Sequence, residues 1–207
     1  MIKKTILGLV LVASLGFGAT FDDGVNAYDK GDYKTALSIF EDLANKGDAE
    51  AQNELGSKYK SGAIIKQDYK KAFEWYEKAA KQGNVYAQSN LAVMYEYGYG
   101  LKQDYKKAFE LYKKAANQGN AYAQGKIGLF YNNGYGVKQD YKKAKEWYEK
   151  AIKKGDLSSY NNLGILYERG QGVKQDKKKA KELYGKVCEG GEQTGCKNYR
   201  ILNEQGY

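Results

Sequence analysis

The sequence predicts an all-α protein, a right-handed α-α superhelical solenoid of helix-turn-helix repeats. One observation is a 36-residue unit that occurs four times, at 49–84, 85–120, 121–156 and 157–192. A second is that the same residue types return at the same places in each copy, such as Ala72, Ala108, Ala144 and Ala180. The third is that the 207 residues include 25 Gly and no Pro, so helices must be separated by glycine. A fixed period of this kind is typical of units that each bury a face against the next.

Residues 1–18 have the pattern of a secretory signal peptide. Two lysines precede a short apolar stretch at 6–17, and small residues follow, so cleavage is expected after Gly18. An uncleaved membrane anchor is the alternative, but a span needs roughly 20 apolar residues and this stretch is shorter. We therefore expect export to the periplasm or outside the cell, with no stable membrane span after cleavage.

Residues 21–48 predict an N-terminal capping pair of helices, near 21–29 and 33–46. Asp32 is the expected N-cap of the second helix, because its side chain can accept a hydrogen bond from a free backbone N–H. Gly47 is expected to end that helix in the left-handed conformation.

Each 36-residue unit predicts two antiparallel helices. The first follows an Asn or Asp N-cap and ends at a glycine-containing loop. The second carries apolar residues at i, i+3, i+4, i+7 and i+8, which form a stripe facing the core; in the first unit they are Ala72, Trp75, Tyr76, Ala79 and Ala80. We interpret the repeated Trp and Tyr positions as core rather than as a ligand site, because they follow the packing period.

These units resemble the Sel-one-like repeat, a relative of the tetratricopeptide repeat with a longer loop between its helices. The resemblance rests on A-x-x-x-L-G-x-x-Y, V-K-Q-D-Y-K-K-A and x-W-Y-E-K-A-A-x-Q-G, and it covers residues 49–192. The chain departs from it at Ile64, where the other copies have a loop glycine, and at Ser159-Tyr160 in place of Ala-Gln. The resemblance implies a concave groove lined by the first helix of each unit.

By analogy with tetratricopeptide grooves, the exposed groove positions fall in three sets that vary from copy to copy. They are Glu50, Tyr86, Tyr122 and Ser158, then Asn53, Ser89, Gly125 and Asn161, then Lys60, Glu96, Asn132 and Glu168. Asn, Tyr and Glu side chains suit a peptide or protein ligand, and we expect a monomeric interaction scaffold. A solvated groove without a dedicated ligand, or a purely structural envelope protein, remains the alternative.

The two cysteines, Cys188 and Cys196, lie at the end of one predicted helix and the start of the next. In an exported protein this placement predicts a disulfide that fastens the C-terminal capping helix, residues 193–207, to the array. The spacing also resembles the Helicobacter cysteine-rich proteins, which carry one such bridge in each repeat. A metal site is not expected, because the chain has no His and no third Cys.

The remaining composition argues against several classes of function. The net charge is +9, but most lysines alternate with acidic residues as on solvated helix faces, so no nucleic acid partner is expected. The absence of His also removes the commonest general base, and no cofactor is expected.

One enzymatic alternative comes from the resemblance alone, since the cysteine-rich subfamily is described as penicillin-binding proteins or weak β-lactamases. The chain has one Ser-x-x-Lys, Ser57 to Lys60, and no S-D-N; Gln193-Thr194-Gly195 is the nearest sequence to K-T-G. No residue is assigned a catalytic role.

Overall fold

The computed structural model describes residues 18–207, which form helices and no strand. The predicted signal peptide, apart from Gly18, lies outside these residues. In chain order the helices are α1 (Phe21–Asp29), α2 (Tyr33–Asn45), α3 (Ala49–Ser61), α4 (Tyr69–Lys81), α5 (Val85–Tyr97), α6 (Tyr105–Asn117), α7 (Ala121–Asn133), α8 (Tyr141–Ile152), α9 (Leu157–Arg169), α10 (Lys177–Glu189) and α11 (Gln193–Glu204).

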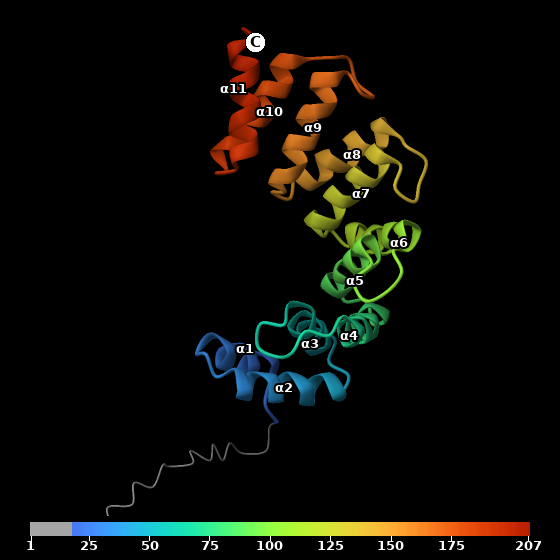
Figure 1. Cartoon of the computed structure of the whole chain (residues 1–207), viewed down its shortest axis with the longest axis vertical. Coiled ribbons are helices and arrows are strands. Elements are labelled where there is room, and N and C mark those ends of the chain that lie inside the picture. Colours follow the sequence, from blue (N-terminus) through green and yellow to red (C-terminus); the bar gives the residue numbers. More distant parts are fainter. Residues whose placement is uncertain (1–17) are drawn as a thin grey trace, which may run out of the picture.

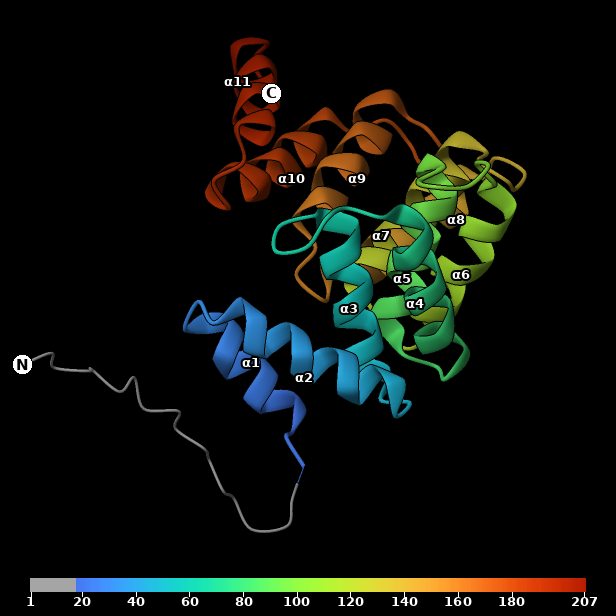
Figure 2. The same ribbon diagram turned by 60° about the horizontal axis from the view of Figure 1, so that its bottom comes forward.

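The helices stack as consecutive antiparallel pairs in a helical solenoid, as the repeats predict (Figure 1). The array bends into an arc, with α1–α2 at one end and α10–α11 at the other, both displaced to the same side of the middle helices. α3 and α5 lie toward the open side of this arc, while α4 and α6 lie away from it. Figure 2 shows the same succession from another direction, with α11 projecting at the C-terminal end.

The helix boundaries follow from capping residues and glycines. Asp68 and Asn84 each accept a hydrogen bond from a backbone N–H three residues on, at 3.0 and 2.9 Å, and so begin α4 and α5. α5 ends at Gly98, whose φ of 71° lies in the left-handed region that glycine adopts without strain.

The core consists of small residues at helix crossings and one tyrosine from the second helix of each repeat. The tyrosines Tyr76, Tyr112, Tyr148 and Tyr184 are all buried. Close packing is clearest at Gly128, where a Cβ would lie 2.5 Å from the ring of Tyr148. The tryptophans were expected in the core, but Trp75 and Trp147 are only half-buried, and a lysine ammonium covers each ring at 4.0 and 4.2 Å.

Glutamine side chains join each of the first three repeats to the helix pair before it. The amide nitrogens of Gln52 and Gln124 donate to the carbonyls of Ala44 and Ala116, eight residues earlier, at 3.0 and 3.1 Å. Gln82 in turn donates to the side-chain oxygen of Gln52 at 2.9 Å. These bonds satisfy carbonyl groups at the end of one helix pair with the side chain that begins the next.

The C-terminal helix is held differently, by the disulfide between Cys188 and Cys196, so the predicted pairing is confirmed. Cys188 and Cys196 stand where Ala80 and Gln88 stand three repeats earlier. Gln88 donates to the Ala80 carbonyl at 3.5 Å, so the disulfide replaces a side-chain hydrogen bond at the same junction. Among the described helices, none combines the length and apolar character that crossing a membrane requires.

Candidate protein-binding face

The surface presented by α3, α5, α7 and α9 toward the open side of the arc is called the inner face below. The residues in the second position of each of these helices are exposed: Glu50, Tyr86, Tyr122 and Ser158. Tyr86 is 67% exposed and Tyr122 is 46% exposed, so two large aromatic rings face solvent from consecutive repeats. These four positions match the exposure that the groove prediction requires.

The second predicted set lies deeper, between neighbouring repeats. Asn53 and Asn161 are half-buried and accept hydrogen bonds from Asn90 and Asn198 of the next repeat, at 3.0 and 3.1 Å. The expectation of exposure is wrong for Ser89 and for Gly125, which are both buried.

The physical reason is that this position faces the next helix pair rather than solvent. At Gly125, a Cβ would lie 2.9 Å from both the Asp156 carboxylate and the Ser159 hydroxyl, so only glycine fits there. The residue type at the position of Ser89 and Gly125 is therefore set partly by contacts with the next helix pair, and its variation between copies does not by itself indicate a ligand surface.

In the third predicted set, the two glutamates accept hydrogen bonds from core tyrosines. Lys60, Asn132 and Glu168 are half-buried, and Glu96 is only 5% exposed, so the expectation of exposure is wrong for Glu96. The Glu96 carboxylate accepts the Tyr112 hydroxyl at 2.6 Å, and Glu168 accepts the Tyr184 hydroxyl at 2.7 Å. The buried hydroxyl groups need acceptors, and these glutamates provide them.

A charged cluster occupies the middle of the inner face. The ammonium of Lys126, on α7, donates to Glu96 at 2.8 Å and to the Tyr97 hydroxyl at 3.3 Å. It also lies 5.6 Å from the centre of the Tyr122 ring, within cation–π range. Burial opposes the charge of Lys126, but the Glu96 hydrogen bond and carboxylate charge outweigh it and raise the lysine pKa.

The sequence-based prediction missed Lys126 and Tyr97. Lys126 stands where the other repeats have Glu54, Asn90 and Asn162. This single positive charge at a repeat position was the feature of the sequence that could have identified Lys126. The exposed ring of Tyr97, at the end of α5, falls outside the positions taken from the tetratricopeptide analogy.

A hollow of about 230 Å³, called the N-terminal pocket below, opens at the start of the inner face. Its lining comes from α1, from α3, and from the beginning of α5: Phe21, Glu50, Asn53, Glu54, Asn84 and Tyr86. Three of the predicted groove residues therefore lie around one hollow: Glu50, Asn53 and Tyr86. Phe21 and Glu54 were not predicted.

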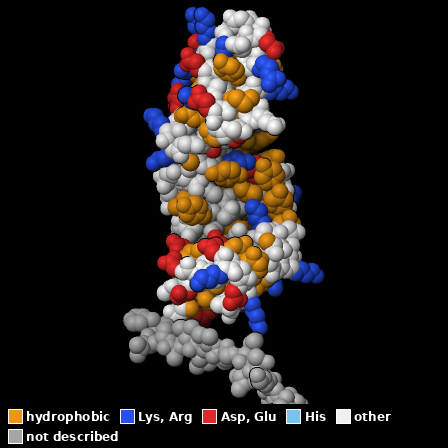
Figure 3. All heavy atoms as spheres, turned by 90° about the vertical axis from the view of Figure 1, so that its left-hand side faces the viewer, with side chains coloured by type: hydrophobic (Ala, Val, Ile, Leu, Met, Phe, Trp, Pro, Cys, Tyr) orange, Lys and Arg blue, Asp and Glu red, His pale blue; other side chains and the backbone are white. Residues whose placement is uncertain are grey.

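Figure 3 views the molecule from the side toward which the arc opens. Hydrophobic side chains gather near the middle of this view, where acidic side chains are sparse. Acidic side chains gather instead toward the upper and lower parts, the lower being the N-terminal end. The inner side of the arc therefore has an apolar centre and charged ends, where lysine and arginine side chains lie among the acidic ones.

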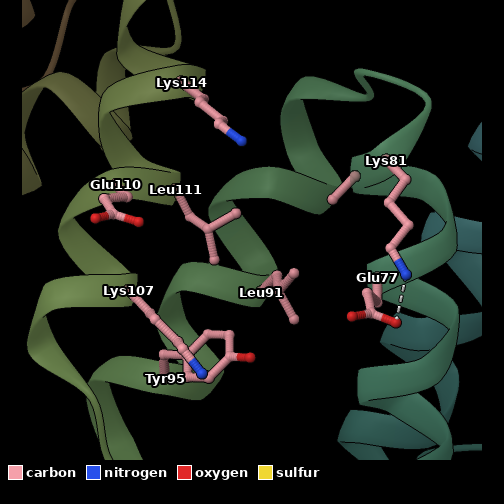
Figure 4. A pocket seen from close by; sticks show the side chains of 9 residues that line it. Glu77, Lys81, Leu91, Tyr95, Lys107, Glu110, Leu111 and Lys114 are labelled. Atoms are coloured by element: carbon pink, nitrogen blue, oxygen red, sulfur yellow. Dashed lines mark ion pairs between the residues drawn. The ribbon is translucent and has the colours of Figure 1, made fainter.

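A second hollow, of about 240 Å³, lies between α4, α5 and α6 (Figure 4). Leu91 and Leu111 point toward one another across it, and charged side chains surround them, including the ion pair of Lys81 with Glu77 at 2.9 Å. It contains none of the predicted groove residues.

The structure gives no support to a β-lactam site at Ser57. Ser57 lies near the buried Tyr76 hydroxyl, whose pKa is raised by burial although the interaction with Ser57 opposes this. Burial lowers the pKa of Lys60, but the chain has no S-D-N or K-T-G element to accompany these two residues. Within residues 18–207 there is no group of three or more His, Cys, Asp or Glu side chains placed to hold a metal ion.

Comparison with known proteins agrees with the repeat pattern. The family described as Sel1 repeat matches residues 49–84, 85–120, 121–156 and 157–192. The search of curated protein sequences gave no match.

Several solved structures are similar. A protective antigen of uropathogenic Escherichia coli with an SLR fold is 35% identical over 90% of this chain, with a TM-score of 0.84. The chain spans 41% of the length of that antigen. A Sel1 repeat protein from Oxalobacter formigenes is 34% identical over 85% of this chain and 72% of its own, with a TM-score of 0.80. Cysteine-rich protein B of Helicobacter pylori is 29% identical over 65% of this chain and 97% of its own, with a TM-score of 0.49.

Proposed function

Because the chain belongs to the Sel1 repeat family, we propose that it is an exported, monomeric scaffold that binds a peptide or protein segment along its inner face. Sel1 repeat proteins generally mediate protein–protein interactions, and the stacked helices give such a partner an extended concave surface. The single observation that carries the proposal is the pair of exposed tyrosines, Tyr86 and Tyr122, one repeat apart on that face.

Exposed aromatic rings on a rigid scaffold favour binding, because they bury a large area with little loss of conformational entropy. Tyrosine is enriched at protein interfaces for this reason and because its hydroxyl still finds a polar partner. The N-terminal pocket lies beside Tyr86, and the cluster around Lys126 lies beside Tyr122, so both rings adjoin polar groups that could select a ligand.

Export is supported by two features. The first 18 residues have the pattern of a signal peptide, and the Cys188–Cys196 disulfide is of the kind that persists in oxidising compartments. Fusion of the leader to a reporter that is active only after export tests this part of the proposal. A reporter that stays inactive would contradict it.

The binding proposal is tested by crosslinking in the producing cell, identification of the captured protein, and titration of that protein with purified variants. Tyr86→Ala and Tyr122→Ala are expected to weaken binding by about tenfold each, since large aromatic residues dominate interface energies. Tyr33→Ala is the matched control, because Tyr33 is exposed to the same extent as Tyr122, 46%, but begins α2.

Unchanged affinity in both inner-face variants would refute the assignment to this surface. Failure to capture any specific partner would instead favour a purely structural role.

A further inference from the structure

The N-terminal pocket is acidic although the chain as a whole carries a net charge of +9. Glu50 and Glu54 line it, and no lysine or arginine does. The corresponding pairs in the next three repeats are Tyr86 and Asn90, Tyr122 and Lys126, Ser158 and Asn162. Two carboxylates thus occur at these positions only in the first repeat, at one end of the inner face.

The polar side chains that shape the pocket are fixed by the fold. Asn53 accepts a hydrogen bond from Asn90 at 3.0 Å, and Asn84 caps α5 through a bond of 2.9 Å from the Ala87 N–H. Phe21 packs on Phe40 with ring centres 5.5 Å apart, while the Tyr86 ring stands 67% exposed at the pocket. Asn53, Asn84 and Phe21 are therefore held in place, and the Tyr86 ring is free to contact a ligand beside them.

The two carboxylates keep a net negative charge at the pocket. Glu50 makes no ion pair within residues 18–207. Glu54 pairs with Lys58 at 3.2 Å, but the ammonium of Lys58 lies over the Tyr28 ring at 3.8 Å, outside the pocket lining. Lys58 therefore offsets one of the two charges and leaves the other uncompensated.

The volume suits a single side chain. Each water molecule occupies about 30 Å³ of liquid, so the 230 Å³ of the N-terminal pocket has room for several waters or for one side chain.

We propose that the N-terminal pocket receives a basic side chain, preferentially that of arginine, from an extended polypeptide bound along the inner face. The inference rests on the proposed function and adds to it the chemical identity of one ligand group. A guanidinium group is planar, carries five N–H donors and is weakly hydrated, so it can pair with Glu50 or Glu54 while stacking on Tyr86. Because the acidic pair occurs in one repeat, it also fixes the position along the inner face at which the partner's arginine binds.

The direct test is nuclear magnetic resonance titration of the ¹⁵N-labelled protein. The probes are N-acetyl-argininamide, its neutral isostere N-acetyl-citrullinamide, and a Gly/Ser peptide that contains one central arginine. Selective shifts at Glu50, Glu54 and Tyr86 are expected with argininamide and not with citrullinamide, and the peptide is expected to bind more tightly.

Two double variants distinguish binding at the pocket carboxylates from attraction to the overall charge of the protein. Glu50→Gln with Glu54→Gln is expected to weaken argininamide binding about tenfold, which corresponds to about 1.4 kcal/mol. Glu74→Gln with Glu110→Gln removes the same charge from exposed positions on α4 and α6 and is expected to leave binding unchanged.

Equal binding of citrullinamide, or equal loss in both double variants, would overturn the proposal. So would absence of selective shifts, which is the result expected if Glu50 only complements the N-terminal dipole of α3.

A peptide that binds no more tightly than argininamide would point to a free cationic metabolite instead. If the captured partner loses affinity for Tyr122→Ala but not for the Glu50/Glu54 variant, the pocket assignment fails while the proposed function stands.

Discussion

At the residue scale, the buried hydroxyl groups of the core tyrosines limit which residues can occupy the inner helices. Tyr112 and Tyr184 donate to glutamates sixteen residues earlier. In the third repeat the same position is Asn132, and the Tyr148 hydroxyl is buried without a hydrogen-bond partner within the described residues. The same repeat position thus supplies a hydrogen-bond acceptor to the core tyrosine in two repeats. In the third repeat it does not, and the unsatisfied Tyr148 hydroxyl lowers the stability of the fold.

These hydroxyl groups predict alkaline instability. Burial raises the pKa of Tyr76, Tyr112 and Tyr148 above the usual value near 10. The unfolded chain releases the phenolic protons first, so the stabilising contribution is complete below pH 10 and is lost as the pH rises above it. We expect the free energy of unfolding to fall by about 1.4 kcal/mol for each such tyrosine per pH unit above about 10.

Urea unfolding at a series of alkaline pH values, with tyrosinate absorbance, measures this loss. Tyr112→Phe should reduce the alkaline slope, whereas Tyr33→Phe, at an exposed position, should not. An equal slope in the wild type and Tyr112→Phe would show that other groups govern the alkaline transition.

The Lys126–Glu96 ion pair is a second residue-scale feature with a measurable consequence. Their side chains are 13% and 6% exposed, so Lys126→Met would leave Glu96 buried beside Tyr112 without its counter-charge. We expect a loss of about 3 kcal/mol in the free energy of unfolding, measured by urea denaturation.

Lys81→Met is the matched control, because Lys81 pairs with Glu77 on the surface and is 70% exposed. Its expected cost is below about 1 kcal/mol. The double variant Glu96→Gln with Lys126→Met removes both charges but keeps an acceptor for the Tyr112 hydroxyl, so it should recover most of the loss. Similar costs for both single lysine variants would argue against a buried pair.

At the scale of the elements, the junctions between helix pairs are joined by side chains rather than by strand pairing. Gln82 and Gln118 end α4 and α6 and donate to Gln52 and Gln88 at 2.9 Å. The equivalent residue after α8 is Lys154, and the side-chain oxygen of Gln124 is buried without a partner within residues 18–207. The end of the third repeat therefore lacks a hydrogen bond that the first two repeats have, and it leaves a buried acceptor without a partner.

Lys154→Gln is expected to complete this junction. The new amide would donate to Gln124 as Gln118 does to Gln88, and a satisfied buried acceptor should raise the free energy of unfolding by about 1 kcal/mol. Urea denaturation measures the change, and Lys153→Gln, which removes the same charge one residue earlier at an exposed site, serves as control. Equal effects of the two substitutions would assign the gain to charge alone.

At the scale of the whole molecule, the helices make their main contacts with the helices before and after them in the chain. This is the property of a solenoid in which stability is nearly a sum over repeats and their interfaces. Because each helix contacts mainly its neighbours, the inner face can keep its curvature while individual residues on it differ from repeat to repeat.

Removal of residues 49–84 tests this. Asp48 would then precede Val85, and Gln88 would take the place of Gln52 beside Ala44, so the shortened chain is expected to fold with its disulfide intact. Its denaturant m-value should fall by roughly a fifth, in proportion to the surface buried on folding. Circular dichroism and urea unfolding measure this, and loss of a cooperative transition would contradict nearest-neighbour stability.

The sequence alone determined the architecture, because a 36-residue period, Asp and Asn caps and glycine stops fix helix pairs locally. The disulfide followed from where two cysteines fall in that period. The candidate site was only partly predictable. Tyr86, Tyr122 and Glu50 are exposed as their register suggests, but Ser89, Gly125 and Glu96 are buried.

Only the tertiary structure decided which variable positions face solvent, because each inner helix also packs against the next repeat, and the extent of that contact depends on both side chains. Lys126 reaches Glu96 across thirty residues of chain, and the N-terminal pocket needs Phe21 from the capping pair beside α3 and α5. Such contacts join separate repeats and are not contained in the repeat unit itself. The period specifies how each unit folds, and the curvature of the stack determines which of its side chains meet.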